Sequence, residues 1–539
     1  MRYSLNILLL CLSCLFVWAC ADDETPTDPP VETPNELDDF VAPSYNDNYT
    51  NVANWSQRSL WNLANVHDPT VMLADDGYFY MYQTDASYGN AHDGHGHFHA
   101  RRSKNLVDWE YLGGTMEAAP DWVKSKLNEY RTIQGLPLIE NPSYGYWAPV
   151  ARNLGNGTYR MYYSIIVDHY IKTGEPNTVH NFDNSWTERA FIGMAETTDP
   201  ASNKWEDKGF VVCSASDKGM NDWYRASTGD WNGYFLYNAI DPTYTITKEG
   251  EHWLTYGSWH SGIATLQVDP GNGKPLAVLG DPWDIQVDSP YGKRIAKRGS
   301  GRWQGSEAPE IIYNPETDYY YLFLAYDELS VAYNTRVARS RKIDGPYLGI
   351  DGQPALTANE ILPVVTHPYS FMNSYGWVGI SHCAVFDDGK GNWYYASQGR
   401  LPRDVPGINV SNAIMMGHVR AISWTADGWP LVMPERYGAV PSIPIEESEL
   451  TGDWEHIDLG YSYAKQKEPV TMTLSSDHTI TGGPWKGSSW SYDATRGVLT
   501  ANGVKLYLRR EVDWEASPRK HTIVYAGYTT VKTYWGKKK

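Results

Sequence analysis

The chain has few cysteines, and most of them fall outside the part that should fold. Of the five cysteines in 539 residues, Cys11, Cys14 and Cys20 lie within the first 20 positions. Only Cys213 and Cys383 remain, which allow at most one disulfide and exclude a disulfide framework. Because these two residues stand in different repeats of the sequence, free buried thiols are favoured over a bond between them.

Positive charge is also scarce. The chain carries 45 Lys and Arg against 64 Asp and Glu, a formal net charge of −19. Phosphate recognition needs clustered basic side chains, and the closing Lys537-Lys538-Lys539 is too short to supply them. The composition therefore argues against a nucleic acid or an anionic membrane as partner, and a neutral polymer fits the charge better than a polyanion does.

The chain lacks a hydrophobic run long enough to span a membrane. The apolar stretch from Leu5 to Trp18 has the length of a signal peptide, and Val17-Trp18-Ala19-Cys20 looks like a bacterial lipobox with Cys20 as the lipidated residue. The acidic residues that follow resemble the tag that directs some lipoproteins to the outer face of the cell. We expect a signal peptide over residues 1–20, a disordered acidic, Pro-rich tether over residues 21–44, and an outer-membrane lipoprotein facing the exterior, with the periplasm as the alternative.

Helical periodicity is scarce, whereas aromatic residues are plentiful, with 40 Tyr and 23 Trp. Five times, a short segment marked by Pro or His leads into two strands split by a Gly, Asn or Asp turn, with aromatics on the second strand. The copies lie roughly 65 to 95 residues apart, within or above the spacing of propeller blades that carry long loops. They begin at His67-Asp68-Pro69, Trp147-Ala148-Pro149, Asp241-Pro242, Glu307-Ala308-Pro309 and Ser381-His382-Cys383.

These repeats predict an all-β chain with a five-bladed β-propeller over residues 45–444. After Pro444 the pattern changes to short strands separated by Gly and Asp turns, which predicts a small C-terminal β-barrel or β-sandwich domain over residues 445–539. This domain could bind sugar or brace the propeller, and bracing is favoured. Two insertions, at about residues 115–143 and 218–237, are expected to be loops that set substrate selectivity.

The segment from His92 to His99 contains four histidines at positions 92, 95, 97 and 99. Alternate histidines on a strand share one face, which would suit zinc. The glycines of the segment instead favour a mobile loop over the channel mouth, and both interpretations stay open.

The first strand of each propeller blade lines the central channel, so the residues that open the repeats converge there. Three repeats open with a carboxylate, Asp68, Asp241 and Glu307, and a fourth opens with His382. Glycosidic cleavage needs a protonated carboxylic acid and an ionised carboxylate at the same pH, and a third carboxylate can help because a like charge raises its neighbour's pKa. An Asx turn before Pro is the structural alternative for either Asp, and a packed core histidine is the alternative for His382.

The repeat openings, together with the segments Tyr256–Ile263 and Gly379–His382, resemble glycoside hydrolase family 43 and, within it, the endo-α-1,5-L-arabinanases. The resemblance covers the propeller and extends more weakly to the C-terminal domain. It implies that Asp68 is the general base, Glu307 the general acid, and Asp241 the residue that tunes the pKa of Glu307. It also implies inversion at the anomeric carbon, with acid and base roughly 6.5 to 9.5 Å apart.

The same resemblance implies a calcium ion at the centre of the channel, bound by His382 and mostly by water, and a sugar site lined by His67, Trp147 and Trp259. The chain departs from the family pattern at Val150, where many relatives carry an acid, and at Ala308, where arabinanases often carry Gly.

The expected function is an inverting hydrolase that makes internal cuts in α-1,5-linked L-arabinan, a side chain of pectin. One alternative is an exo-acting α-L-arabinofuranosidase or β-xylosidase on the same scaffold, because loops that block the end of a cleft decide where a polymer is cut. Another is a non-catalytic surface glycan-binding lipoprotein. We expect a monomer that binds arabinan and no nucleic acid.

Overall fold

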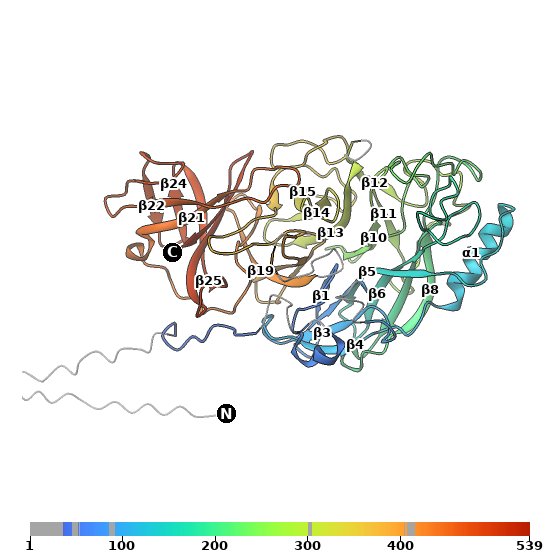
Figure 1. Cartoon of the computed structure of the whole chain (residues 1–539), viewed down its shortest axis with the longest axis horizontal. Helices are drawn as coiled ribbons and strands as arrows, with labels where there is room; N and C mark the ends of the chain where they lie inside the picture. The colour runs from blue at the N-terminus through green and yellow to red at the C-terminus, as the bar shows by residue number, and fades with distance from the viewer. Residues whose placement is uncertain are drawn as a thin grey trace, which may run out of the picture.

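The computed structural model describes residues 36–45, 52, 54–85, 92–299, 304–403, 405–406 and 415–539. The predicted signal peptide, Cys20 and most of the predicted tether lie outside the described residues. Within these ranges, five four-stranded antiparallel sheets are present together with one seven-stranded sheet near the C-terminus (Figure 1). Among the described helices, none has both the length and the apolar character of a membrane span.

The five small sheets are the blades of a propeller, and each uses four consecutive strands. Blade 1 comprises β1 (Thr70–Leu73), β2 (Phe79–Tyr82), β3 (Ala100–Ser103) and β4 (Glu110–Gly113), and blade 2 comprises β5 (Tyr144–Asn153), β6 (Tyr159–Val167), β7 (Phe191–Thr197) and β8 (Glu206–Cys213). Blade 3 comprises β9 (Thr243–Ile246), β10 (His252–Tyr256), β11 (Ile263–Val268) and β12 (Lys293–Ala296). Blade 4 comprises β13 (Ser306–Asn314), β14 (Tyr319–Tyr326), β15 (Asn334–Ser340) and β16 (Val364–Thr366), and blade 5 comprises β17 (Ala384–Asp387), β18 (Trp393–Gly399), β19 (Met416–Trp424) and β20 (Pro430–Val432).

The blades form a closed ring. Their first strands β1, β5, β9, β13 and β17 contact one another in this order, and β17 also contacts β1. Backbone hydrogen bonds join the two ends of the ring, since the Asn65 N–H donates to the Met415 carbonyl at 3.0 Å and the Gly417 N–H donates to the Leu63 carbonyl at 2.8 Å. The prediction of a five-bladed propeller is confirmed.

Alternation along the strands explains how the blades pack. Successive side chains of a strand point to opposite faces, and a blade is covered by a neighbour on each face. In β14, Tyr320 and Leu322 join a cluster that contains Ile263 and Ile295 of blade 3, whereas Phe323 joins a cluster that contains residues of blade 5. The run of aromatic and aliphatic residues in this strand therefore fills both faces of the blade.

Cys213 and Cys383 are buried free thiols, as the sequence favoured.

The C-terminal domain is a single antiparallel sheet in the order β22-β21-β27-β26-β25-β24-β23. The segment 479–481 lies between the two edge strands of this sheet and bonds to the ends of both. The Thr481 N–H donates to the Thr473 carbonyl at 2.9 Å, and the Ile480 N–H donates to the Ser488 carbonyl at 2.8 Å, so the sheet curls on itself. Of the two predicted forms, this agrees with a barrel-like sheet and not with two stacked sheets. Its strands are β21 (Gly452–Asp458), β22 (Val470–Leu474), β23 (Trp490–Asp493), β24 (Val498–Ala501), β25 (Val504–Asp513), β26 (Lys520–Tyr528) and β27 (Thr533–Lys538).

The C-terminal sheet packs against the propeller and forms hydrogen bonds with it. Trp535 of β27 packs on Tyr369 with ring centroids 5.1 Å apart, and its indole N–H donates to the Val432 carbonyl at 2.9 Å. The loop between β21 and β22 reaches blade 4, where the Tyr461 hydroxyl donates to the Asp327 carboxylate at 2.9 Å. The C-terminal sheet is therefore packed against the propeller, and its role as a brace stays a prediction.

The N-terminal segment that the structure describes also lies against the C-terminal domain. Leu37 belongs to a buried cluster with Val512 and Trp514, and the ring of Tyr45 lies 5.4 Å from that of Trp514. Arg519 donates to the Tyr45 carbonyl at 2.9 Å. Residues 36–45, most of which fall in the expected tether, are therefore packed against the fold.

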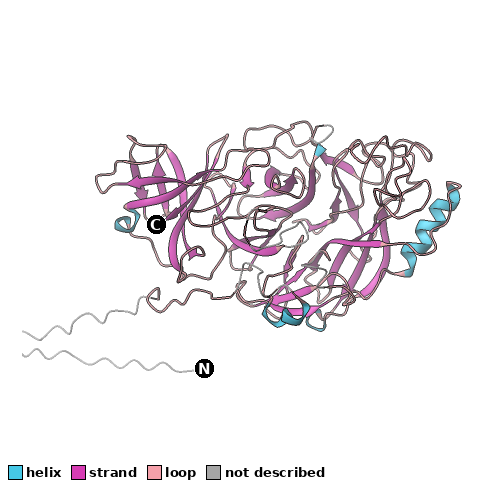
Figure 2. Ribbon diagram, in the orientation of Figure 1, coloured by secondary structure: helices cyan, strands magenta, loops and turns pink. Residues whose placement is uncertain are grey.

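The first insertion contains the α-helix α1 (Asp121–Ile133), where the sequence predicted a loop. Val123, Leu127 and Tyr130 form its buried face against blade 2 and recur at helical spacing. Figure 2 shows α1 at the end of the molecule opposite the C-terminal sheet. The remaining described helices are short 3₁₀ turns, η1 (Trp55–Leu60), η3 (Pro200–Ser202) and η5 (Glu447–Leu450).

Candidate active site

A repeated left-handed turn positions the candidate residues. Near the start of the innermost strand of every blade, one residue has a φ between 42° and 54°. Such a conformation is sparsely populated by residues other than glycine, although Asp and His tolerate it better than most. The turn brings the side chains around it to one end of the channel. The five residues are Asp68, Ala148, Asp241, Ala308 and His382.

Asp68 is surrounded by groups that favour its ionised form. Its carboxylate lies 2.9 Å from Nδ1 of His67 and 3.0 Å from Nδ1 of His382. The Thr84 hydroxyl donates to the same carboxylate at 2.8 Å. Burial alone would raise the pKa of Asp68, but His382 and His67 outweigh burial and hold that pKa well below its usual value. Asp68 is therefore a carboxylate at neutral pH.

Glu307 accepts hydrogen bonds from neutral donors, and no imidazole of the described residues is hydrogen-bonded to it. One of its carboxyl oxygens accepts from the Ser258 hydroxyl at 2.7 Å and from the Trp259 indole N–H at 2.9 Å. The other oxygen accepts from the Tyr333 hydroxyl at 2.8 Å. Burial raises the pKa of Glu307 above its usual value, and the donors from Ser258 and Tyr333 only partly oppose that rise. Glu307 is therefore easier to protonate than Asp68.

Asp241 is buried beside Glu307 and has a single backbone donor, the N–H of Ala308 at 3.3 Å. Burial raises the pKa of Asp241 to about 8, and the charges of Glu307 and Asp68 add to the rise while His382 opposes it. Asp241 and Glu307 therefore hold at least one proton between them at neutral pH. The three carboxyl groups thus have unequal ionisation, as glycosidic cleavage requires.

His382 contacts Asp68 and interacts electrostatically with Asp241. Burial would lower its pKa, but Asp68 and Asp241 outweigh burial and raise the pKa of His382 to about 9. Calcium takes six to eight oxygen ligands, and the described residues gather no cluster of three His, Cys, Asp or Glu ligands around His382. A calcium ion at this position would have to be held mostly by water, as the family resemblance implies, and it stays a prediction.

A pocket of about 510 Å³ lies beside the carboxyl groups and is lined by Trp147, Ser258 and Trp259. Trp147 is 43% exposed and offers a free aromatic face. Trp259 stacks on Trp231 of the second insertion, with ring centroids 4.9 Å apart and an angle of 27° between the planes. Such faces suit the C–H surface of a sugar ring. His67 is buried against Asp68, so it contacts that carboxylate and does not line the open pocket.

Sequence reasoning did not single out four residues that complete this site. Ser258 stands within the segment Tyr256–Ile263 and Trp231 within the second insertion, both of which the sequence had marked. Thr84 follows β2, and Tyr333 precedes β15 in a connection that carries no repeat signal. Their roles follow only from the contacts described above.

The histidine-rich segment is packed against aromatic rings. His92 and His99 are buried and stacked at 3.8 Å, His95 stacks on Trp55 at 3.5 Å, and His97 stacks on Tyr146 at 3.3 Å. Burial lowers the pKa of His92 to about 2 and that of His99 to about 3. Within the described residues these histidines form no metal-ligand cluster.

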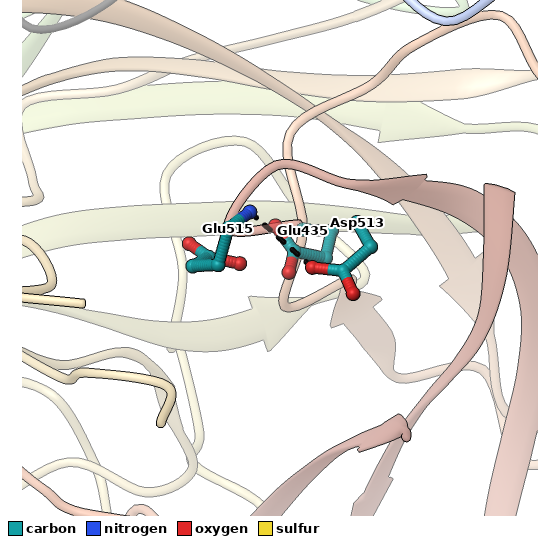
Figure 3. A group of neighbouring side chains, drawn as sticks. All are labelled: Glu435, Asp513 and Glu515. Atoms are coloured by element: carbon teal, nitrogen blue, oxygen red, sulfur yellow. Dashed lines mark hydrogen bonds between the residues drawn. The ribbon is translucent and has the colours of Figure 1, made fainter. Parts of the chain in front are cut away.

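Another acidic group lies at the junction of the two domains. Figure 3 shows Glu435, Asp513 and Glu515 with their carboxylates close together. The ammonium group of Lys537 lies 3.0, 2.8 and 2.5 Å from these three carboxylates, respectively. Burial raises the pKa of Glu435, whereas Lys537 outweighs burial at Glu515 and lowers its pKa. A lysine therefore already neutralises part of this group.

Two family models match the chain. The model described as "Glycosyl hydrolases family 43" matches residues 63–430, and the model described as "C-terminal lipocalin-like domain" matches residues 434–536.

Several named proteins are similar to the chain. It is 26% identical over 512 residues to extracellular endo-alpha-(1->5)-L-arabinanase 2 of Bacillus subtilis, covering 90% of this chain and 95% of that protein. It is 27% identical over 498 residues to the extracellular endo-alpha-(1->5)-L-arabinanase of Thermotoga petrophila, covering 87% and 93%. An extracellular exo-alpha-(1->5)-L-arabinofuranosidase of Cellvibrio japonicus is 23% identical over 381 residues, covering 68% and 86%.

Solved structures show the same fold. The endo-1,5-alpha-L-arabinanase of Thermotoga petrophila superposes with a TM-score of 0.65 at 24% identity, covering 88% of this chain and 99% of that chain. A family 43 glycoside hydrolase of Bacillus licheniformis superposes with a TM-score of 0.64 at 23% identity, covering 88% and 98%.

Proposed function

Since the chain belongs to glycosyl hydrolases family 43, we propose that it hydrolyses α-1,5-linked L-arabinan and cuts within the polymer. The two relatives that span most of the chain are both named endo-arabinanases, which supports internal cutting. The exo-acting relative spans less of the chain, and it keeps an α-L-arabinofuranosidase as the second candidate.

The observation that carries this proposal is the unequal ionisation of buried carboxyl groups beside a pocket with aromatic walls. Asp68 is held ionised by two imidazoles, while burial raises the pKa values of Glu307 and Asp241. A base and a proton donor are therefore available at the same pH. A protein that only binds glycans has no need for such an arrangement.

In the proposed reaction, Asp68 takes a proton from a water molecule while the water oxygen bonds to the anomeric carbon. Glu307 gives its proton to the glycosidic oxygen as the bond from that oxygen to the anomeric carbon breaks. One product carries an inverted anomeric hydroxyl and the other a free hydroxyl. Proton exchange with solvent then returns Asp68 and Glu307 to their starting states. Asp241 acts on the protonation of Glu307, and the spacing of roughly 6.5 to 9.5 Å between base and acid stays a prediction.

The substitution Glu307→Gln tests the assignment of the acid. Glutamine keeps the size of the side chain and its acceptor oxygen but has no acidic proton, so kcat on arabinan should fall by roughly a thousandfold. Binding of arabino-oligosaccharides, measured by calorimetry, should change little. Glu316→Gln, at an exposed position of the same hairpin, is the matched control and should keep full activity. Full activity of Glu307→Gln would mean that another group is the acid.

Product sizing on linear arabinan separates internal from terminal cutting. The proposal expects a range of oligosaccharides at early times, whereas release of monosaccharide alone would make the chain an exo-acting enzyme. A panel that includes xylo-oligosaccharides tests the β-xylosidase alternative. Tight binding of arabinan without any turnover would identify a glycan-binding lipoprotein instead.

We also propose the cellular setting and the ion that the sequence predicts. Lipid on Cys20 would anchor the chain in the outer membrane, and Cys20→Ser should then release it from the membrane fraction.

His382 would contribute to a calcium site, so equilibrium dialysis should find calcium bound to the unchanged protein and less bound to His382→Ala. Proper folding of that variant is checked by circular dichroism.

A further inference from the structure

A second pocket, which we call the seam pocket, lies where the propeller meets the C-terminal sheet. Its volume is about 680 Å³, larger than that of the pocket beside the catalytic carboxyls. Its walls come from the outer part of blade 4, from the turn between β19 and β20, and from β25 and the end of β26. None of the candidate catalytic residues lines it.

Strand direction places the seam pocket on the face of the propeller away from the catalytic carboxyls. Glu307 stands at the start of β13, whereas Tyr319 of the pocket pairs with Asn314 at the end of β13. Seven residue steps with a rise of about 3.3 Å each place Glu307 and Asn314 at most roughly 23 Å apart along β13, which contains a bulge between Glu307 and Glu310. The turn after Trp424 lies at the same far end of its blade. The end of β17 pairs with Trp393, Trp393 pairs with Ile422, and Ile422 lies two residues before Trp424. A short sugar in the channel therefore cannot reach this pocket.

The aromatic rings of the seam pocket are fixed by contacts of their own. The Tyr507 hydroxyl accepts from the Ala426 N–H at 2.8 Å, and the Tyr528 hydroxyl donates to the Pro430 carbonyl at 2.5 Å. The ring of Tyr319 lies 4.4 Å from the guanidinium carbon of Arg339. Because these rings are held in place and remain partly exposed, they can accept a ligand with little loss of side-chain entropy.

Polar groups surround these rings. Arg339 donates to the Asp427 carbonyl at 2.7 Å, and the ion pairs of the described residues include neither Arg339 nor Lys505. Thr529 and Thr530 also line the pocket. Aromatic faces interspersed with donors and hydroxyls match the two surfaces of a sugar, its C–H face and its hydroxyl groups. A polyanion suits the chain less well, because its formal net charge is −19.

We propose that the seam pocket is a second carbohydrate-binding site, which holds a stretch of the same neutral pentose polymer that the channel cleaves. The identity of the sugar rests on the proposed function. A polymer can occupy both sites, or bring the enzyme to a second chain, whereas a trisaccharide fills only one. The seam pocket therefore raises affinity for the polymer without changing the cleavage of short substrates.

Two variants test the site. Tyr319→Ala removes one aromatic wall, and Thr530→Trp fills the pocket from an exposed position without removing an internal contact. Tyr78→Ala is the matched control, because Tyr78 directly precedes the second strand of its blade, whereas Tyr319 opens the corresponding strand, and Tyr78 lies 4.8 Å from the guanidinium carbon of Arg102. Each change is made in the Glu307→Gln chain for binding and in the active chain for kinetics, with melting temperatures to verify folding.

Affinity electrophoresis with linear arabinan should show dissociation constants about five- to tenfold higher for Tyr319→Ala and Thr530→Trp, and unchanged for Tyr78→Ala. In the active chain, kcat/KM on arabinotriose should stay within about twofold for all three variants. Unchanged polymer affinity in Thr530→Trp would overturn the proposal, and so would an equal loss in Tyr78→Ala. A pocket that takes oligogalacturonides in place of arabino-oligosaccharides would also overturn it.

This experiment separates failure of the site from failure of the proposed function. If the unchanged chain does not cleave arabinan, the proposed function fails, and the binding comparison is repeated over a panel of neutral polysaccharides. A loss of affinity for one of these polymers in Thr530→Trp would still support a carbohydrate site at the seam. If the unchanged protein and Thr530→Trp bind every polysaccharide of the panel equally, the seam pocket is not a carbohydrate site.

Discussion

At the residue scale, Asp68 and Glu307 differ in the kind of partner that each carboxyl group has. Both carboxyl groups are largely removed from solvent, but Asp68 lies against two imidazoles, whereas Glu307 receives hydrogen bonds from neutral donors. A positive charge stabilises a carboxylate more strongly than a neutral donor does, so burial prevails only at Glu307. The direction of each pKa shift follows from these contacts and could not be derived from residue types alone.

Tyr333→Phe should move the alkaline limb of the pH–activity profile to higher pH. The Tyr333 hydroxyl stabilises the ionised form of Glu307, so its removal should raise the pKa of that acid further. The acid then stays protonated to higher pH, and the limb should shift upward by roughly one pH unit in kcat/KM. Tyr256→Phe, whose hydroxyl donates to the Tyr291 carbonyl, is the control and should leave the limb in place. A downward shift would contradict this view of Tyr333.

At the element scale, repetition explains which site residues the sequence could reveal. Asp68, Asp241 and His382 occupy the same left-handed position in three blades, and Glu307 precedes that position in a fourth. A residue that recurs at one place in a repeat can be found by aligning the copies. Tyr333 and Thr84 act from connections that differ between blades, so no pattern in one sequence marks them. Their contribution depends on how neighbouring blades pack.

The helix α1 also shows what local sequence can miss. Its apolar face consists of only a few residues among polar ones, and the surrounding all-β pattern favoured a loop. The periodicity of Val123, Leu127 and Tyr130 was present in the sequence, but burial against blade 2 is what stabilises so short a helix.

Leu127→Ala should therefore destabilise the protein by about 2 to 4 kcal/mol, because a fully buried leucine is replaced by a cavity between α1 and blade 2. Ile133→Ala in the last turn of the same helix is the control, since Ile133 is 52% exposed. That control should change stability by less than about 0.5 kcal/mol. Urea unfolding measures both values, and equal effects would show that α1 is not docked as described.

At the scale of the whole molecule, the two domains share a buried charged junction around Lys537. Lys537→Met removes the ammonium group that contacts Glu435, Asp513 and Glu515, which should cost about 3 to 5 kcal/mol of stability at neutral pH. The uncompensated carboxyls should then have raised pKa values, so the loss should shrink as pH falls and they become protonated. Thermal unfolding from neutral to acidic pH measures this dependence.

Lys532→Met is the comparison for that experiment. Lys532 pairs with Asp458 at the surface, where both side chains are more than 40% exposed. Its loss should cost less than about 1 kcal/mol and should depend little on the junction carboxyls. A similar cost for both variants would mean that the junction contributes no more than a surface ion pair.

The domain plan was easier to predict from sequence than its details. Five repeats indicated five blades, because each repeat is one sheet of consecutive strands. The form of the C-terminal domain stayed open between a barrel and a sandwich, since short alternating strands are common to both and only long-range pairing distinguishes them. The pairing of β21 with β27, in which Trp454 lies opposite Lys538, is of this long-range kind.

The closure of the ring has a consequence for protein engineering. No blade borrows a strand from another, and the two ends of the propeller meet through backbone hydrogen bonds between residues 63–65 and 415–417. A circularly permuted propeller that starts between two other blades would keep every sheet whole, provided that a linker joins the original ends. Starting the chain inside a blade would instead split one sheet between distant parts of the polypeptide.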